Sequence, residues 1–244
     1  MPQLTTLLFD YGNTLIAFGP AQQEAQLAAM RRVLETAGIT YDLPALNALR
    51  KEQVLRPYHR DGIENDFREV CREVIALFAD EATAEAHTEA MMQARYTAFL
   101  DSVSVDPAVP ALLERLSRRY RLGLLSNYPC TASIRDSLDR LGLLRFFDTL
   151  VVSGDVGFAK PHPATYETLL TRMQVSPAEC LYVGDNWLAD VQGAKRLGLH
   201  AAWVREHIPY ETFDPQPGDF PADLELPRLL DLEAALETFP PAAS

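Results

Sequence analysis

The second half of the chain alternates between short apolar segments and longer amphipathic ones, and this alternation constrains the fold more than any other feature. The predicted strands cover residues 122–125, 149–153, 180–183 and 200–204, and the predicted helices cover 107–120, 131–141, 164–173 and 189–197. An apolar run from Leu7 to Phe9 adds a strand near the start of the chain. Such alternation predicts an α/β fold, with a parallel sheet covered by helices on both faces.

Four amphipathic segments, with no strand among them, separate the first strand from the rest of the sheet. They cover residues 20–37, 43–55, 65–78 and 82–100. In the third, Phe67, Val70, Val74 and Phe78 recur every three or four residues, the period of a helix with one buried face. Such a block can form a helical bundle. We predict a three-layer, Rossmann-like α/β/α core from residues 1–16 and 103–244, with an all-helical cap from residues 17–102.

Proline and glycine mark the predicted ends of several elements. The helix from residue 43 is predicted to stop before Pro57, which leaves residues 57–60 as a turn. Residues 209–221, rich in Pro, Asp and Gly, predict a loop. A short edge strand at 222–226, a last helix at 227–236 and a loose end at 239–244 complete the prediction.

The overall charge excludes some classes of partner. The 244 residues carry a net charge of −12, which gives no electrostatic support for binding nucleic acid or an anionic membrane. The three cysteines, Cys71, Cys130 and Cys180, lack metal-ligand spacing and are expected to be reduced thiols. No apolar run reaches about 18 residues, and no basic leader opens the chain. A cytoplasmic protein is expected, either a monomer or a homodimer.

Polar side chains follow four of the predicted strands, at the point where each strand ends. In chain order they are Asp10 and Thr14, Ser126 and Asn127, Lys160, and Asp185 with Asp190. The carboxyl ends of parallel strands share one edge of the sheet, so these groups are expected to converge there. Three carboxylates, one ammonium group and small hydrogen-bond donors suit the transfer of a phosphoryl group.

Each of these groups has a predicted role in that chemistry. Asp10 and Asp185, with the backbone carbonyl of Gly12, can hold Mg²⁺, and Asp190 can support the metal or orient its waters. Asp10 can also attack phosphorus and form an aspartyl-phosphate. Lys160 supplies the cation that so many carboxylates require. The predicted phosphate-binding residues are Thr14, Ser126, Asn127 and Lys160.

Taken singly, each of these residues has a plainer interpretation. Asp10 and Asp185 can be ordinary turn residues, Ser126 can cap a helix, and Lys160 can be a solvated loop charge. What favours the functional interpretation is that all of them occur together, in order, each after a predicted strand. The arginines Arg31, Arg32 and Arg50 are interpreted as solvated helix faces, whereas Arg56 and Arg60 can meet a substrate.

The four segments resemble, in this order, the four motifs of the haloacid dehalogenase superfamily of hydrolases. Asp10 matches the nucleophile, Ser126 the hydroxyl of the second motif, Lys160 the lysine of the third, and Asp185 with Asp190 the acidic fourth motif. The resemblance covers residues 4–204, and its most specific pieces are 157–163 and 184–190. It implies a Mg²⁺-dependent phosphatase of small phosphorylated metabolites, with the helical insertion as its cap.

One position departs from the phosphatase pattern of this family. Where a second aspartate usually acts as general acid and base, this chain has Gly12, and general acid–base help is worth about 10²–10⁴-fold in rate. Slow turnover is therefore expected unless a cap residue such as Tyr58 or His59 replaces that aspartate. A dehalogenase or phosphonatase, or a catalytically weak phosphate-binding or interaction protein, is the alternative. Dehalogenases of the family favour an aromatic residue at the position of Gly12, so this chain fits them poorly.

Overall fold

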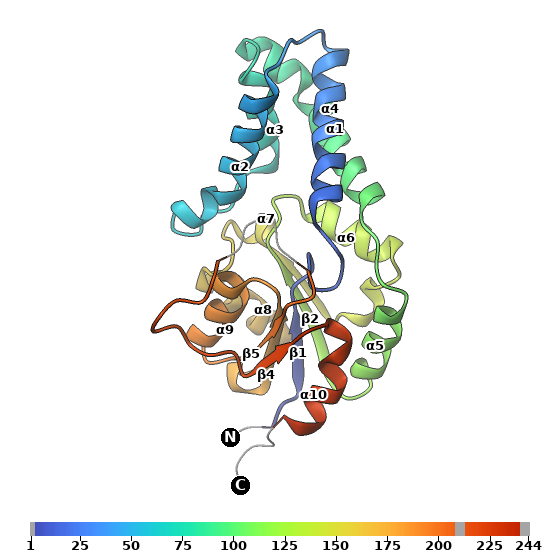
Figure 1. Cartoon of the computed structure of the whole chain (residues 1–244), viewed down its shortest axis with the longest axis vertical. Coiled ribbons are helices and arrows are strands. Elements are labelled where there is room, and N and C mark those ends of the chain that lie inside the picture. Colours follow the sequence, from blue (N-terminus) through green and yellow to red (C-terminus); the bar gives the residue numbers. More distant parts are fainter. Residues whose placement is uncertain (1–2, 208–212, 240–244) are drawn as a thin grey trace.

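A six-stranded sheet forms the base of the molecule, and helices cover both of its faces (Figure 1). The computed structural model describes residues 3–207 and 213–239. The strands are β1 (Thr6–Phe9), β2 (Arg121–Ser126), β3 (Thr149–Val152), β4 (Cys180–Gly184), β5 (His200–Val204) and β6 (Leu224–Leu226). They lie in the order β3-β2-β1-β4-β5-β6, and every neighbouring pair is parallel. The predicted α/β fold with a parallel sheet is confirmed.

Alternate side chains of β1 enter two different hydrophobic layers, as the two-residue period of a strand requires. Leu7 and Phe9 pack in the layer that includes residues of α5 (Ala108–Ser117), α6 (Thr131–Arg140) and α10 (Leu232–Thr238). Leu8 packs on the other face, with residues of α8 (Pro163–Met173) and α9 (Gly193–Arg196). Since both faces are covered, β1 is buried throughout. The edge of the sheet at its carboxyl end forms the floor of the site described below.

The shorter elements complete the core. They are the helix α7 (Ser153–Val156), the wider helical turns of η3 (Trp187–Gln192), and the single turns η1 (Leu144–Phe146), η2 (Pro177–Glu179) and η4 (Leu229–Asp231). The predicted helix at 189–197 is therefore η3 followed by α9, and it begins two residues early because the Asn186 side chain caps it by accepting from the Ala189 N–H. Of the predicted loop 209–221, residues 209–212 lie outside the described residues, as do residues 240–244 of the predicted loose end.

Four helices form a separate bundle above the sheet, between β1 and α5 (Figure 1). They are α1 (Pro20–Thr36), α2 (Leu43–His59), α3 (Phe67–Ala76) and α4 (Glu81–Ser102). The bundle has its own hydrophobic cluster, built from one face of each helix and including Met30, Leu34, Leu46, Val74 and Met91. We call this bundle the cap. Because its core is separate from those of the sheet, the cap is a packed unit in its own right.

The predicted stop of α2 before Pro57 is wrong, since the helix continues to His59. A proline inside a helix has no N–H to donate to the carbonyl four residues earlier, here that of Gln53. In this structure the side-chain amide of Asn65 donates to the Gln53 carbonyl instead, at 2.8 Å. This donor from the next segment satisfies the free carbonyl, so Tyr58 and His59 are helical rather than part of a turn.

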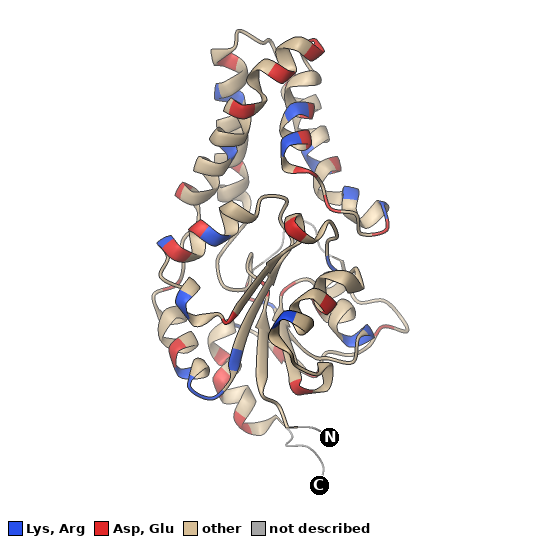
Figure 2. Cartoon of the chain, turned by 180° about the vertical axis from the view of Figure 1, so that it is seen from behind, with Lys and Arg blue, Asp and Glu red and all other residues tan. Residues whose placement is uncertain are grey.

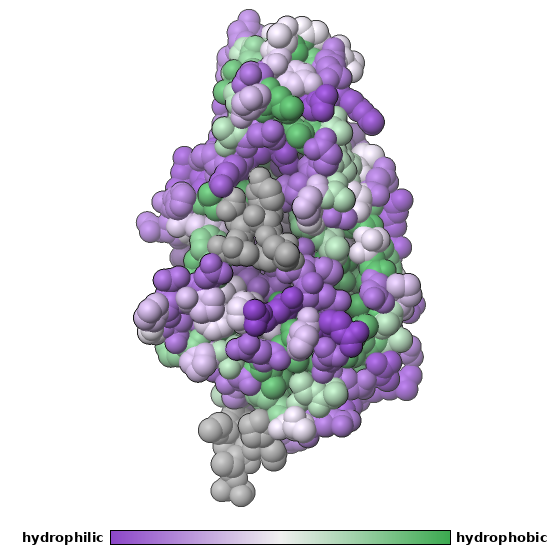
Figure 3. Space-filling view, in the orientation of Figure 1, coloured by the Kyte–Doolittle hydropathy of each residue, from purple (hydrophilic) through white to green (hydrophobic). Residues whose placement is uncertain are grey.

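The surface carries mixed charge. In the view of Figure 2, acidic and basic residues are interspersed along the cap helices. The face shown in Figure 3 is mostly hydrophilic, with small hydrophobic patches. None of the helices in the described part of the chain is long and apolar enough to cross a membrane.

Substitution of Leu34 by alanine is expected to lower the free energy of unfolding by about 2–5 kcal/mol, because Leu34 is fully buried in the cap and the change leaves a cavity. Leu77→Ala is the control, since that side chain is 44% exposed and its loss is expected to cost below about 1 kcal/mol. Denaturant titration measures both values. Equal losses for the two variants would contradict a separately packed cap core.

Candidate active site

Asp10 stands where β1 ends, and the backbone holds it there. Its N–H donates to the carbonyl of Val183 on β4 at 2.9 Å, which continues the sheet pairing by one residue. The chain then turns sharply, with Asn13 in the left-handed region at φ 59° and its side chain accepting from the Phe18 N–H. Gly12 does not take a left-handed backbone, so the turn does not require glycine at that position.

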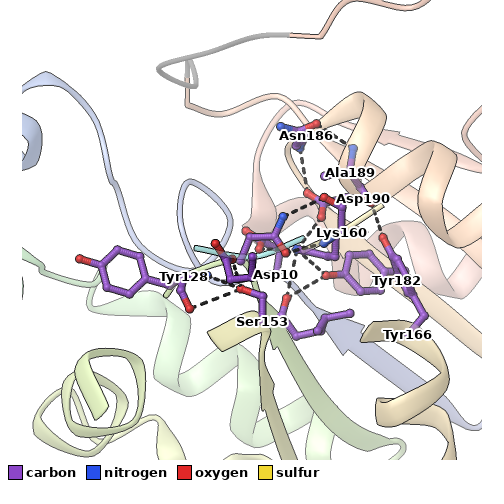
Figure 4. Close-up of polar contacts among 12 residues, drawn as sticks. Asp10, Tyr128, Ser153, Lys160, Tyr166, Tyr182, Asn186, Ala189 and Asp190 are labelled. Atoms are coloured by element: carbon purple, nitrogen blue, oxygen red, sulfur yellow. Dashed lines mark hydrogen bonds and ion pairs between the residues drawn. The ribbon is translucent and has the colours of Figure 1, made fainter. Parts of the chain in front are cut away.

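The ammonium group of Lys160 is the centre of the site (Figure 4). Its Nζ lies 2.7 Å from Asp10 Oδ1 and 2.7 Å from Asp190 Oδ1. It also lies 2.8 Å from the Tyr182 hydroxyl and 3.1 Å from the Leu125 carbonyl. An ammonium group has only three N–H donors, but the Tyr182 hydroxyl itself donates to Leu125 at 2.9 Å. Lys160 can therefore donate to both carboxylates and to the tyrosine at once.

Asn127 holds the backbone of Lys160. Its side-chain Nδ2 donates to the Lys160 carbonyl at 2.9 Å, and its Oδ1 accepts from the Lys160 N–H at 2.7 Å. This reciprocal pair uses the amide oxygen of Asn127 and one of its N–H donors. Both hydrogen bonds hold Lys160, and the predicted contact of Asn127 with phosphate remains a prediction.

Asp190 is held on both of its carboxylate oxygens. Oδ1 accepts from Lys160, and Oδ2 accepts from the backbone N–H of Asn186 at 2.9 Å. A Cβ atom at position 184 would lie too close to this carboxylate, so only glycine fits there. The glycine of the Gly184–Asp185 pair is therefore required by the close approach of Asp190 to the backbone.

Burial and neighbouring charges shift the pKa values of this cluster. The pKa of Asp10 is raised to about 6, because burial and the charge of Asp190 outweigh the opposing charge of Lys160. Burial and the charges of Asp10 and Asp190 raise the pKa of Asp185 well above its usual range. For Lys160, burial alone would lower the pKa, but the two carboxylates that it contacts outweigh burial and raise it. The lysine therefore stays charged, and the carboxylates need more positive charge than it provides.

The three carboxylates have the composition of a site for a divalent cation. Asp10, Asp185 and Asp190 are buried, and one oxygen of each lies within 4.8 Å of the others. Three carboxylates and one ammonium group sum to a charge of −2, which a divalent cation would neutralise. Within residues 3–207 and 213–239, Asp185 forms no ion pair, unlike Asp10 and Asp190. Its carboxylate is therefore left to bind a cation, and hard oxygen donors suit Mg²⁺.

A cavity of about 300 Å³ lies against the strand ends and continues into the cap. From the core it is lined by Asp10, Gly12, Ser126, Asn127, Lys160 and Asp185, among others. From the cap it is lined by residues that include Gln26, Arg50, Tyr58, Glu64 and Arg95. The carboxylate cluster and the cap thus line one cavity.

Not every predicted site residue faces this cavity. Ser126 does so from the last position of β2. Thr14 lines a second, smaller cavity instead, and its buried Oγ1 has no partner in the part of the chain that the structure describes. Contact between Thr14 and phosphate therefore remains a prediction.

The predicted cap residues differ in whether they line the cavity. Tyr58 lines the cavity and its hydroxyl contacts the Asn127 side chain, whereas His59 is exposed and does not line it. Arg50 was interpreted as a solvated charge, but it lines the cavity and donates to Gln23 at 3.0 Å. Arg56 instead pairs with glutamates of α2 and α3, away from the cavity. These outcomes depend on how the cap helices are rotated above the sheet, which the apolar pattern does not specify at their ends.

Two residues of the site, Tyr182 and Glu64, are not predicted from the sequence. Tyr182 lies in a fully buried strand among apolar residues; a buried tyrosine hydroxyl generally needs a partner, which is a usable signal. Glu64 follows α2, lines the cavity and accepts from the Ser153 hydroxyl. Burial raises the pKa of Glu64. No pattern in the sequence marks this residue, because its surroundings come from the core.

Comparisons with known proteins agree with this geometry. A family model of haloacid dehalogenase-like hydrolases matches residues 4–198. Glyceraldehyde 3-phosphate phosphatase of Methanopyrus kandleri is 26% identical over 229 residues, covering 94% of this chain and 95% of the relative. Ribulose-1,5-bisphosphate 5-phosphatase of Halopiger xanaduensis is 27% identical over 211 residues, covering 80% and 82%.

Solved structures share the fold. A 2-haloacid dehalogenase from Pseudomonas syringae superposes with a TM-score of 0.76 at 22% identity, covering 97% of this chain and all of that one. A HAD-hydrolase from Bacillus subtilis, bound to magnesium, superposes with a TM-score of 0.69 at 21% identity, covering 96% and 99%. At sequence identities this low, the two similarities show only that the fold is shared.

Substitution of Lys160 by methionine is expected to lower the free energy of unfolding by about 3–5 kcal/mol at pH 7.5, because it leaves buried carboxylates without their cation. The folded-state pKa of Asp10 is already above its ordinary value of 3.8, so its ionised form destabilises the fold above about pH 6 and this penalty fades below it. Without Lys160 that pKa rises further. The loss should therefore be smaller at pH 5.5 than at pH 7.5 in denaturant titrations.

The control is Arg118→Met, which removes an exposed cation paired with Glu114. Its effect is expected to be below about 1 kcal/mol at both pH values. A Lys160→Met variant as stable as this control, or one whose deficit does not shrink at low pH, would contradict the charge balance described for the site.

Proposed function

The chain belongs to the haloacid dehalogenase-like hydrolases, and from this membership we propose that it is a Mg²⁺-dependent phosphatase of small phosphorylated metabolites. The observation that carries the proposal is the buried cluster of Asp10, Asp185, Asp190 and Lys160 at the floor of the cavity. The names of the two phosphatase relatives support a phosphomonoester as the substrate. The net charge of −2 at the cluster supports the need for a divalent cation.

Asp10, Asp185 and the backbone carbonyl of Gly12 are the residues we assign to Mg²⁺. When bound, the ion supplies positive charge that lets an anionic phosphate approach an anionic nucleophile. Asp190 has both oxygens engaged, by Lys160 and by the Asn186 N–H, so we assign it to positioning the lysine. Its place beside the metal ligands agrees with a supporting role.

In the proposed reaction, a carboxylate oxygen of Asp10 attacks phosphorus, a new O–P bond forms, and the bond to the leaving alcohol oxygen breaks. Water then attacks the aspartyl-phosphate, which releases phosphate and restores the carboxylate. Lys160, held against Asp10 at 2.7 Å, keeps the nucleophile in place and offers positive charge to the phosphoryl oxygens. Ser126, at the end of the neighbouring strand, is our candidate for a phosphate donor, with Thr14 and Asn127 as further candidates.

The departing alcohol must take up a proton, and Gly12 has none to give. Two cap side chains that line the cavity carry a hydroxyl or carboxyl group that can exchange a proton, Tyr58 and Glu64. The pKa of the Tyr58 hydroxyl is raised above its usual value by burial, which makes it a weaker acid. The pKa of Glu64 is also raised by burial, so this carboxyl keeps its proton at a higher pH than an exposed glutamic acid. Glu64 is therefore the better candidate for the missing acid.

The cap would exclude water during this reaction. The loop between α2 and α3 pairs with the segment before Lys160, through the Ala159 N–H to Gly62 at 2.7 Å and the Glu64 N–H to Gly157 at 3.0 Å. This pairing joins the cap to the core beside the lysine. We infer that the cap opens for substrate entry and product release, as lids over active sites commonly do.

Asp10→Asn is expected to lower the hydrolysis of p-nitrophenyl phosphate by about a thousandfold or more, because an amide is a poor nucleophile and a poor metal ligand. The wild type should lose activity when Mg²⁺ is removed by chelation and regain it when the ion is restored. Phosphate release measures both effects. Asp231→Asn, at a half-buried carboxylate outside the cavity, should be unaffected.

Equal rates for wild type and Asp10→Asn would reject the assignment of the nucleophile. Release of chloride from a 2-chloroacid, without phosphatase activity, would instead identify a dehalogenase.

Gly12→Asp is expected to raise the rate with alkyl phosphates by up to about a hundredfold, since it introduces the absent acid. The substitution fits, because a Cβ at position 12 would make only an ordinary contact with the Phe18 Cβ, at 3.6 Å. Gly12→Asn is a control of the same size without the proton. Rates over a series of aryl and alkyl phosphates should depend less steeply on leaving-group pKa in the aspartate variant; no such change would indicate that another residue, such as Glu64, already donates the proton.

A further inference from the structure

The cap half of the cavity contains polar atoms that lack a partner. Gln26 on α1 is only 5% exposed, and its Oε1 is buried without a hydrogen bond. Arg95 on α4 has a buried Nε that also lacks a hydrogen bond. Both statements concern the residues described by the structure, and both side chains line the cavity. A buried donor and a buried acceptor left unpaired are costly, so their presence in a cavity wall needs an explanation.

The contact between Gln26 and Arg95 determines which of their polar atoms remain unpaired. The Gln26 Nε2 donates to the backbone carbonyl of Arg95 at 3.0 Å, so its amide oxygen is the free end. Among the described residues, the contacts of the Arg95 guanidinium are weak: its Nη1 lies 3.6 Å from the Cys71 sulfur, and it lies 5.4 Å from the centroid of the Phe67 ring. No carboxylate pairs with it within the described ranges. The result is a cation and an acceptor that line one cavity, each with a buried atom that no described residue satisfies.

This pair lines the same cavity as the proposed phosphate site. One helical turn beyond Arg95, the Phe99 ring packs against the Tyr128 ring with centroids 4.7 Å apart. Tyr128 directly follows Ser126 and Asn127 at the end of β2, and all of these residues line the same cavity. A short molecule with its phosphate at Asp10 would thus extend toward Arg95.

We propose that Arg95 and Gln26 bind the end of the substrate remote from its phosphate, and that this end carries a second anionic group next to a hydroxyl. The inference rests on the proposed phosphatase function and names its substrate class. A guanidinium binds carboxylate or phosphate oxygens through charge-assisted hydrogen bonds, and the amide oxygen accepts only from a donor such as a hydroxyl. Met30 and Val70 supply apolar wall for a short carbon frame.

Three compounds with the same glycerol frame test the proposal by competition with p-nitrophenyl phosphate. Glycerol 3-phosphate has no second anion, 3-phosphoglycerate adds a carboxylate, and glycerol 1,3-bisphosphate adds a second phosphate. With wild type, the compound whose second anion fits should inhibit at a concentration about tenfold or more below glycerol 3-phosphate. Arg95→Gln should abolish this preference, and Arg95→Lys should restore part of it. The compound that competes best identifies which anion the site takes.

Arg32→Gln is the matched control, because it removes one exposed arginine of the cap that does not line the cavity, and it should leave the preference unchanged. If Arg95→Gln does not fold, Gln26→Leu carries the test. That variant should weaken 3-phosphoglycerate more than the phosphate ester of 3-hydroxypropionate, which lacks the hydroxyl.

A wild type without preference among the three compounds, or an Arg95→Gln variant that keeps the preference, would overturn the inference and leave the phosphatase function standing. Failure to hydrolyse p-nitrophenyl phosphate would reject the phosphatase function itself. In that case the rise in melting temperature with each compound, measured in Mg²⁺, still reports the preference and decides the inference.

Discussion

The structure of the site depends on one buried ammonium group. Lys160 draws together Asp10 after β1 and Asp190 within η3, residues far apart in the chain. Each of these charges would be unfavourable in the interior without its partners. Removal of one partner from such a set usually costs more stability than the intact pair contributes. The Tyr182 hydroxyl and the Leu125 carbonyl complete the contacts of the lysine, so the site is a property of the sheet as a whole.

The segment that carries this lysine also joins the core to the cap. Asn127 makes two hydrogen bonds to the Lys160 backbone from the core side. The loop after α2 makes backbone hydrogen bonds to residues 157–159 from the cap side. Glu64 adds a side-chain contact to Ser153 across the same boundary. Motion of the cap would therefore act on the backbone next to the lysine, which offers a direct physical link between access to the cavity and the order of the site.

Local charge in the cavity differs from the charge of the chain. The protein is strongly acidic overall, and its carboxylate cluster adds to that. Yet the cap presents Arg50 and Arg95 to the same cavity, on the side away from Asp10. An anionic substrate is repelled by the whole protein only weakly at physiological salt, because exposed charges are screened over about 8 Å. Cations that line the cavity are screened less, so we propose that they contribute to the choice of substrate.

The sequence by itself determined the parallel sheet and the meeting of Asp10, Lys160, Asp185 and Asp190 at one edge. Strand periodicity dictates which segments enter the sheet, and the parallel direction brings their carboxyl ends together whatever the details of packing. Only the tertiary structure decided the rest. The continuation of α2 through Pro57 depends on a donor from Asn65, and the contact of Glu64 with Ser153 depends on how cap and core are placed against each other. The contacts of Asn127 and Arg95 depend on how distant segments pack within the core and within the cap. These contacts join segments with no shared period, so no pattern along the chain can reveal them.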